Sequence, residues 1–357
     1  MYGLARPVLF SLAPDTAHAI AMAALFPLEH MAPLRGLVRR WILGNAGRDP
    51  RLVRRVMGID FPNPVGLAGG FDKNAKRARS LAALGFGFLE LGTVTADAQA
   101  PNPPPNLFRL TADRALVNRL GFPNEGAARV TERIAKMRAR GAIGVPVGIS
   151  IGKSRSVPVE PIQGAVEDYL TSYRLARRAA DFVVVNVSSP NTKGLRAMQG
   201  GEIARALFEA LERENASSAT RVPLLVKIAP DLDHAGLDEL LDVAMAAGLD
   251  GVVATNTTLS RAGLATSESD VERVGAGGLS GPPLRARALE VVRRVRERIG
   301  ADKAVIGVGG IEGPDDARAL LDAGADLVQL YTGFVYGGPS TAARIVRGLV
   351  TATNRRR

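Results

Sequence analysis

Two amides and three hydroxyls follow a short apolar run near the middle of the 357-residue chain. The run, Phe-Val-Val-Val at 182–185, has the length and β-branching of a buried parallel strand. The polar residues that follow it are Asn186, Ser188, Ser189, Asn191 and Thr192. A strand end with so many hydrogen-bonding groups predicts a site for a small polar molecule. The alternative is a solvated turn before the next helix, since Ser, Asn and Pro favour turns.

Two lysines could supply positive charge to such a site. Lys227 lies between Val226 and Ile228 in an otherwise apolar run. A buried ammonium without an anion is costly, so Lys227 should meet a carboxylate, a phosphate or an electron-rich ring. The alternative is a lysine that reaches solvent from the strand end. Lys73 stands in a glycine-rich turn after another apolar run.

Glycines follow two apolar runs near the C-terminus. Gly309 and Gly310 end one run, and Thr332 and Gly333 follow the next. Glycines let backbone N–H groups approach a phosphate, although a lone pair of glycines is also typical of a tight turn. Together with the lysines and amides, this pattern predicts a site for a phosphorylated ring cofactor and a small anionic substrate.

The elements that must position these residues follow a regular rhythm. Eight short apolar runs rich in Val and Ile lie at 65–68, 86–91, 145–151, 182–187, 224–228, 251–254, 305–308 and 327–330. Segments patterned as helices lie between them, at 165–178, 203–214, 236–247, 285–299 and 314–323. This alternation predicts an α/β fold, a (β/α)8 TIM barrel, with a doubly wound sheet as the alternative. In such a barrel the polar strand ends meet at one face.

Two segments interrupt the rhythm. Residues 97–121 are long and rich in proline, and we expect an extended loop near the active face. Residues 259–281 lack periodicity, and we expect a mobile lid there.

The N-terminal part differs from the rest of the chain. Residues 19–28 are nearly all apolar but too few to cross a membrane, and no secretory pattern precedes them. One helical face then carries Leu34, Leu37, Val38, Trp41 and Ile42, with arginines off the stripe. A basic amphipathic helix of this kind suits the membrane interface, and the alternative is packing on the core. We therefore expect a small N-terminal helical extension, residues 1–45, before a barrel domain, residues 46–357.

Composition narrows the chemistry. The absence of cysteine excludes a disulfide framework, thiolate metal sites and a cysteine nucleophile or base. The three histidines have no ligand spacing, so we expect no metal site. The net charge of +11 predicts attraction to an anionic membrane surface or to acidic small molecules. We expect no nucleic-acid partner, because the charge is dispersed and aromatic residues make up only 5%.

Six motifs at the expected strand ends carry a family resemblance. They are Gly69-Gly70-Phe71-Asp72-Lys73, Asn118-Arg119-Leu120-Gly121-Phe122, Asn186-Val187-Ser188-Ser189-Pro190-Asn191-Thr192, Val226-Lys227-Ile228-Ala229-Pro230-Asp231, Ala254-Thr255-Asn256-Thr257-Thr258 and Gly277-Gly278-Leu279-Ser280-Gly281. Together they resemble the dihydroorotate dehydrogenases, FMN enzymes of pyrimidine synthesis, and specifically their membrane-associated, quinone-dependent class 2. The resemblance extends from about residue 14 to residue 334.

The resemblance implies a set of site residues. FMN would contact Gly69, Gly70, Phe71, Asp72, Lys73, Thr93, Ser150, Asn186, Lys227, Thr255, Gly281, Gly310, Tyr331 and Thr332. Dihydroorotate, oxidised to orotate, would be held by Lys73, Asn118, Arg119, Leu120, Gly121, Phe122, Asn186, Asn191, Asn256 and Thr257. The family's catalytic base corresponds to Ser189, whereas strand alternation alone could favour Ser188. At Ser150 the family usually has asparagine, and a water could bridge the shorter side chain to FMN.

The resemblance also implies an electron acceptor and a location. The family's soluble class uses a cysteine base, which this chain lacks. The quinone class passes electrons to ubiquinone or menaquinone through a tunnel between N-terminal helices, here toward Arg109 and Tyr331; ordinary loop packing is the alternative for both residues. The expected location is peripheral, on the cytoplasmic side of the inner (cytoplasmic) membrane.

Two other functions remain open at this point. A phosphosugar aldolase or isomerase on the same barrel would use Lys227 as a Schiff-base or electrostatic residue and would bind no flavin. A non-catalytic membrane adaptor would explain the positive charge and the amphipathic helix, but not the polar groups on so many strand ends.

Overall fold

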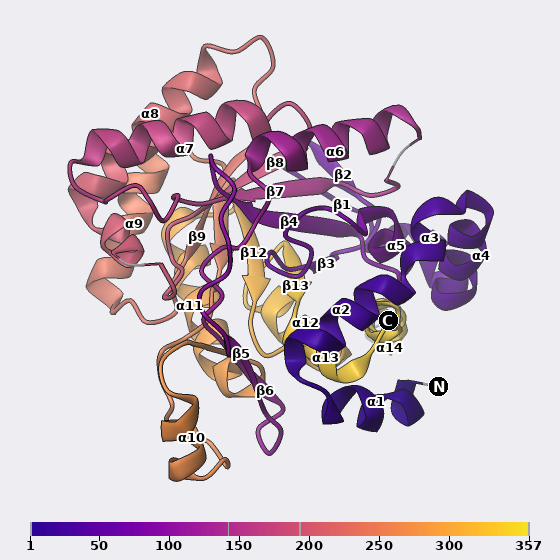
Figure 1. Ribbon diagram of the computed structural model, residues 1–357. Coiled ribbons are helices and arrows are strands. Elements are labelled where there is room, and N and C mark those ends of the chain that lie inside the picture. The colour runs from indigo at the N-terminus through magenta and orange to yellow at the C-terminus, as the bar shows by residue number, and fades with distance from the viewer. Residues whose placement is uncertain (1, 142, 193, 356–357) are drawn as a thin grey trace.

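The computed structural model describes residues 2–141, 143–192 and 194–355. Within this part of the chain, eight parallel strands close into a barrel (Figure 1). The strands are β3 (Val65–Leu67), β4 (Phe88–Val94), β7 (Val147–Ile151), β8 (Phe182–Asn186), β9 (Leu224–Ile228), β10 (Gly251–Ala254), β12 (Ala304–Val308) and β13 (Leu327–Leu330). Around the barrel their order is β10, β12, β13, β3, β4, β7, β8, β9. The predicted TIM barrel is confirmed, and closure of the sheet rules out the doubly wound alternative.

All eight predicted barrel strands are present, and β9, β10 and β13 have the predicted bounds. The helices around them are α5 (Ala78–Ala83), α6 (Ala127–Ala139), α7 (Ile162–Ala176), α8 (Gly201–Ala216), α9 (His234–Ala246), α11 (Arg285–Ile299), α12 (Pro314–Asp322) and α14 (Thr341–Arg355). The five helices expected from periodicity correspond to α7, α8, α9, α11 and α12. Their apolar faces pack on the strands, whose side chains are buried on both faces.

Aromatic side chains close the N-terminal end of the barrel. A short hairpin, β1 (Arg54–Val56) and β2 (Ile59–Phe61), crosses this end. Phe61 contacts Phe88 edge to face, with ring centroids 5.4 Å apart, and Phe182 lies 6.3 Å from both. Glycine at 66 makes room for the Phe88 ring, because a Cβ there would clash with it. The opposite end, where the strands terminate, is therefore the end that can hold a site.

Two segments contain regular structure that the sequence did not predict. The expected loop at 97–121 includes a hairpin, β5 (Leu107–Leu110) and β6 (Ala115–Asn118). The expected lid at 259–281 includes α10 (Glu268–Val274) and β11 (Gly278–Ser280), and β11 pairs with β6. The sequence did not reveal these elements because strands of three or four residues are too short to show a period. Pairing between β6 and β11 ties the two segments together beside the barrel mouth.

The predicted N-terminal extension is helical, and it lies beside the barrel near α13 (Thr332–Gly337) and α14 (Figure 1). Its helices are α1 (Tyr2–Ser11), α2 (Pro14–Ala24), α3 (Phe26–His30) and α4 (Ala32–Leu43). The apolar stripe of α4 is divided: Ile42 is buried on the core, whereas Leu37 and Trp41 are 66% and 74% exposed. The core-packing alternative therefore holds for Ile42, while Leu37 and Trp41 do not pack on the core. Among the described residues, no helix combines the length and apolar character needed to cross a membrane.

Candidate active site

A cavity at the C-terminal end of the barrel brings most of the expected site residues together. It lies inside the strand ends, above the apolar barrel interior. The predicted residues that line it are Gly69, Gly70, Lys73, Thr93, Asn118, Leu120, Gly121, Phe122, Asn186, Ser189, Asn191, Lys227, Thr255, Asn256, Thr257, Gly281, Gly310, Tyr331 and Thr332. The alternative in which the polar stretch after β8 is a solvated turn is thereby excluded, because Asn186 and Ser189 are buried at the cavity.

Two residues of the glycine-rich turn after β3 point elsewhere. The Asp72 carboxylate accepts hydrogen bonds from the backbone N–H groups of Lys76 (2.9 Å) and Arg77 (2.7 Å). Asp72 therefore fixes the turn that presents Lys73, and burial raises the pKa of its carboxyl. The Phe71 ring lies against Tyr331, with centroids 5.6 Å apart, and lines a different cavity. Neither side chain lines the main cavity, so their expected contact with a cofactor is limited to the backbone.

The Arg119 side chain also leaves the cavity. Its guanidinium donates to the carbonyl oxygens of Val274 (2.7 Å) and Ala276 (3.0 Å) and stacks over Phe108 at 4.5 Å. Arg119 therefore joins the β5–β6 hairpin to the segment that carries α10. The sequence motif placed it beside substrate-contacting residues, but alternation along the chain turns its side chain outward.

Ser150 acts through its neighbour on β4. Its hydroxyl shares a 2.9 Å hydrogen bond with the Thr93 hydroxyl, and Asn186 Nδ2 donates to the same Thr93 oxygen at 3.1 Å. Ser150 is fully buried and does not line the cavity. Ser150 therefore supports Thr93, which does line the cavity, and a contact between Ser150 itself and a cofactor stays a prediction.

The two adjacent serines after β8 have different environments. Ser188 is fully buried, donates to Asn186 Oδ1 (3.2 Å) and accepts a hydrogen bond from Asn256 Nδ2 (2.9 Å). Ser189 instead lines the cavity, and its hydroxyl accepts a hydrogen bond from the backbone N–H of Asn191 at 3.3 Å. Of the two hydroxyls, only that of Ser189 faces the space where a substrate could lie.

Amide side chains connect the loops at the cavity mouth. Asn191 Nδ2 donates to Asn118 Oδ1 at 3.0 Å, which joins the loop after β8 to the end of β6. Asn256 Oδ1 accepts from the backbone N–H of Thr257 at 2.8 Å. Amides present both a donor and an acceptor, so this arrangement can read the alternating N–H and C=O groups of a small ring.

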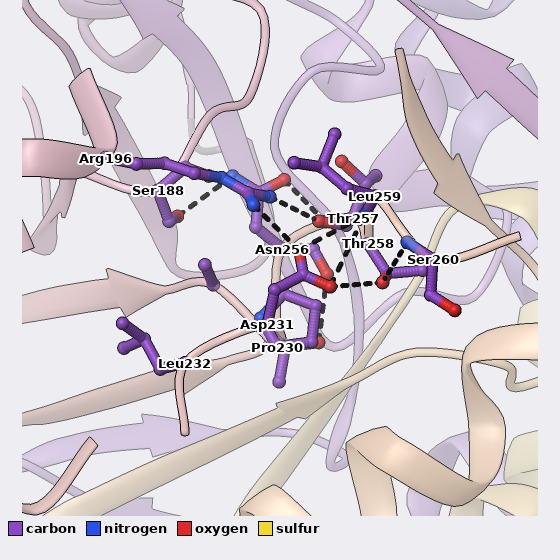
Figure 2. Close-up of polar contacts among 12 residues, drawn as sticks. Ser188, Arg196, Pro230, Asp231, Leu232, Asn256, Thr257, Thr258, Leu259 and Ser260 are labelled. Atoms are coloured by element: carbon purple, nitrogen blue, oxygen red, sulfur yellow. Dashed lines mark hydrogen bonds and ion pairs between the residues drawn. The ribbon is translucent and has the colours of Figure 1, made fainter. Parts of the chain in front are cut away.

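An arginine that the sequence did not predict joins the loops after β8, β9 and β10. Arg196 lies 2.7 Å from Asp231 and donates to the carbonyl oxygens of Ser188 (3.2 Å) and Thr257 (3.1 Å). Figure 2 shows Arg196 reaching from the Ser188 side to Asp231, beside the Thr257–Ser260 loop. Asp231 also accepts from the hydroxyl of Thr258. No local pattern marked Arg196, because its partners come from three different loops.

Lys227 has a carboxylate partner inside the barrel. Its ammonium donates to Glu90 Oε1 at 3.0 Å, and Gln329 Nε2 donates to Glu90 Oε2 at 2.9 Å. Lys227 therefore does not reach out to solvent, and one of its three expected partner types is present. The only sequence signal for Glu90 was a charged residue in a run otherwise read as a buried strand.

Lys73 presents a second positive charge at the cavity. Its ammonium donates to the carbonyl oxygen of Gly70 at 2.7 Å. Burial lowers the pKa of Lys73 to about 8, opposed by attraction to Asp15 and Asp72. An anion bound beside this ammonium would favour its charged form.

The glycine pair after β12 and the start of α13 line the cavity at the ends of two neighbouring strands, β12 and β13. Gly309 and Gly310 have positive φ angles of 138° and 71°, which favour glycine. Helix α13 begins at Thr332, and the first N–H groups of a helix have no partner within it. The Thr332 hydroxyl is held at 2.8 Å by Ser280. These backbone N–H groups can donate hydrogen bonds to a phosphate, as the sequence predicted.

A second, apolar cavity of about 270 Å3 lies between the N-terminal helices and the barrel. Residues of α1 and α2, including Phe10 and Met22, line it together with Phe334 and Arg109. The Arg109 guanidinium stacks 4.6 Å from the Phe10 ring and donates to the carbonyl oxygen of Leu12 at 2.7 Å. Tyr331 lines both this cavity and the polar one.

Comparison with known proteins decides between the remaining functions. The dihydroorotate dehydrogenase family matches residues 51–352. The chain belongs to this family. A dihydroorotate dehydrogenase (quinone) of Thermobifida fusca is 51% identical over 342 residues, covering 96% of this chain and 89% of the relative. A protein of the same name from Nocardia farcinica is 50% identical over 355 residues, covering 99% and 94%.

Solved dihydroorotate dehydrogenase structures share the fold. The enzyme of Eimeria tenella in complex with ferulenol superposes with a TM-score of 0.80 at 34% identity, covering 94% of this chain and 95% of that chain. Membership in the family rules out the aldolase, isomerase and membrane-adaptor alternatives. The quinone-dependent relatives agree with the absence of cysteine and with the N-terminal helices.

Proposed function

We propose that this dihydroorotate dehydrogenase binds FMN in the polar cavity, oxidises (S)-dihydroorotate to orotate there, and delivers the electrons to a membrane quinone in the apolar cavity. Family membership supports the reaction, a step of pyrimidine biosynthesis. The observation that carries the rest is Tyr331, which lines both cavities. One side chain thus separates a polar site for a small anion from an apolar site for a lipid-soluble acceptor.

The residues of the polar cavity fit FMN. Backbone groups at Gly309, Gly310 and Thr332 suit the phosphate, and Lys227 suits the electron-rich edge of the ring. The proposed FMN contacts are Gly69, Gly70, Lys73, Thr93, Asn186, Lys227, Thr255, Gly281, Gly310, Tyr331 and Thr332, with backbone contact only from Phe71 and Asp72 and indirect support from Ser150. When bound, FMN supplies the acceptor for the hydride that leaves C6 of dihydroorotate.

Amides and Lys73 would hold the substrate. Asn118 and Asn191 are hydrogen-bonded to each other at the mouth, and Asn186 and Asn256 lie deeper. Their paired donors and acceptors suit the ring edge, while the Lys73 ammonium suits the carboxylate. Leu120, Gly121, Phe122 and Thr257 line the same space and exclude water.

Ser189 is the proposed base. It would take the proton from C5 of dihydroorotate as the hydride leaves C6, so the substrate loses two hydrogens and two electrons in all, one hydrogen as a proton and the other as a hydride. A serine hydroxyl is a weak base at its free pKa and needs a relay that carries the proton onward. Its position at the cavity, in contrast to buried Ser188, supports this assignment.

The N-terminal helices would place the apolar cavity on a membrane. Leu4 and Val8 of α1 and Leu37 and Trp41 of α4 are large apolar side chains that remain exposed. Such side chains, with arginines nearby, suit the interface of an anionic membrane. We therefore propose that residues 1–45 form a membrane and quinone-access segment on the barrel domain, residues 46–357. The proposed acceptor is ubiquinone or menaquinone, at the cytoplasmic side of the inner membrane.

The colour of the purified protein tests the cofactor. We expect yellow protein whose flavin absorbance is bleached by anaerobic dihydroorotate and restored by a quinone. Protein that remains colourless and inactive after FMN is supplied would contradict the proposal.

A further inference from the structure

The carboxylate of Glu90 lies at the floor of the polar cavity with no route to solvent. It is fully buried, and both of its oxygens have partners: Lys227 at 3.0 Å and Gln329 at 2.9 Å. Lys227 and Gln329 line the cavity, whereas Glu90 lies behind them. Glycine at 69 is required for this placement, because a Cβ there would clash with Glu90 Oε1.

A purely structural role explains this arrangement poorly. A buried ion pair contributes little net stability, since the cost of removing two charges from water offsets their attraction. Apolar side chains fill the barrel interior below, including Val253 and Ile306. A well-packed apolar pair at this level could stabilise the strands equally well.

The partners of Glu90 indicate what the pair does instead. Gln329 donates to Glu90 through Nε2, and its Oε1 is buried without a partner among the described residues. One carboxylate thus holds Lys227 and Gln329 in position at the cavity. An ammonium close to a redox group favours the negative charge gained on reduction, and a carboxylate behind the ammonium opposes that effect.

We propose that Glu90 is a positioning residue that orients Lys227 and Gln329 and, with Lys227, sets the reduction potential of the bound flavin. Glu90 lowers the potential by offsetting the charge of Lys227, and Lys227 raises it. The inference rests on the proposed flavin site and adds a residue that neither contacts substrate nor lines the cavity. The quinone must take electrons from the reduced flavin. A weaker positive field at the ring lowers the flavin's reduction potential and so favours this second half of the reaction.

The test is the midpoint potential of the flavin in full-length holoenzyme, measured by anaerobic equilibration with a reference dye. Glu90→Gln should raise the equilibrium constant for two-electron reduction of the flavin at least tenfold, which raises the midpoint potential by about 30 mV. Lys227→Gln should lower the midpoint potential, and the potential of the double variant should lie between those of Lys227→Gln and wild type. Sulfite, an anion that adds to oxidised flavin, should bind Glu90→Gln about tenfold more tightly.

Glu297→Gln is the matched control, because it removes one exposed carboxylate from the outer face of α11 and should leave the potential unchanged. A Glu90→Gln flavoprotein with the same potential as this control would overturn the inference. If Glu90→Gln loses FMN, the double variant must show a higher potential than Lys227→Gln; equal values would overturn the inference. Wild-type protein that holds no FMN would instead overturn the proposed function, and the inference with it.

Discussion

At the residue scale, the site depends on which of several similar side chains faces the cavity. Ser188 and Ser189 are adjacent and chemically identical, and strand alternation alone, which could favour Ser188, did not decide which of them faces the cavity. The structure does, because Ser188 is engaged with Asn186 and Asn256 while Ser189 lines the cavity. The motifs therefore predicted most of the residues that line the cavity, but the direction of each side chain, as for Arg119, depended on partners far away in the sequence.

Replacing Ser189 by alanine tests its role as the base. Ser189→Ala should retain FMN and bind orotate, yet reduce the flavin at least ~10²-fold more slowly, the usual scale for general-base help. Ser188→Ala is the matched control and should slow flavin reduction less, because it removes a hydroxyl that only supports the amides. The measurement is anaerobic stopped-flow absorbance of the flavin, and an exchange of the two phenotypes would contradict the assignment.

The lowered pKa of Lys73 predicts how ligand binding depends on pH. Burial brings this pKa to about 8. Lys73 is therefore positively charged below that pH and loses its charge as the pH rises through it. Orotate affinity should therefore be constant below pH 8 and fall up to about tenfold per pH unit above it. Lys73→Arg keeps its charge throughout and should show no such decline. Titration of the flavin spectrum with orotate from pH 6 to 10 measures the affinity of both proteins. A wild-type affinity that does not change with pH would contradict the binding of the substrate carboxylate by Lys73.

At the element scale, the barrel was predictable and its additions were not. Strands β9 and β10 were predicted correctly because buried parallel strands are continuous apolar runs, readable without knowledge of their neighbours. Strands β5, β6 and β11 gain stability only from one another, and β6 and β11 lie about 160 residues apart in the chain. Such long-range pairing leaves no local pattern. The same reason hid Arg196, which connects the loops after β8, β9 and β10.

The ion pair of Arg196 should matter more to catalysis than to stability. Arg196→Ala removes hydrogen bonds to the Ser188 and Thr257 carbonyls, so the loops that carry Ser189 and Asn256 should lose their common support. We expect kcat to fall about tenfold with FMN content unchanged, since small displacements of positioned groups are costly. Arg298→Ala is the matched control, because it breaks the exposed pair with Asp242, which contributes little to stability, and should leave kcat unchanged. Equal kcat for the two variants would refute a positioning role.

At the scale of the whole molecule, two cavities share one residue. The polar cavity opens among the loops of the barrel mouth, and the apolar cavity opens beneath α1 and α2. A small anion and a lipid-soluble quinone would therefore reach Tyr331 from different directions, without meeting. The amphipathic pattern of α4 left membrane contact and core packing as alternatives, and it did not show that Ile42 and Leu43 would pack on the core while Leu37 and Trp41 stay exposed.

The exposed apolar side chains of α4 should be needed for quinone delivery from a membrane and for nothing else. Leu37→Ser/Trp41→Ser alters side chains that are largely solvent-exposed, so the fold and flavin reduction by dihydroorotate should be unchanged. Each side chain can contribute roughly 1.5–3 kcal/mol when fully buried, and partial insertion of two should still weaken binding to anionic vesicles about tenfold or more. Flavin reoxidation by a long-tailed quinone in those vesicles should slow in proportion.

Two comparisons make this experiment decisive. A short-chain quinone that dissolves in water should reoxidise the variant at the wild-type rate, because the apolar cavity itself is intact. Leu259→Ser removes an exposed apolar side chain outside the N-terminal extension and should leave vesicle binding unchanged. Salt should weaken the remaining binding of all variants, since arginine contacts with anionic lipids are screened over ~8 Å at physiological ionic strength. Equal reoxidation of the α4 variant and wild type in vesicles would mean that the quinone enters by a path that does not depend on this face of α4.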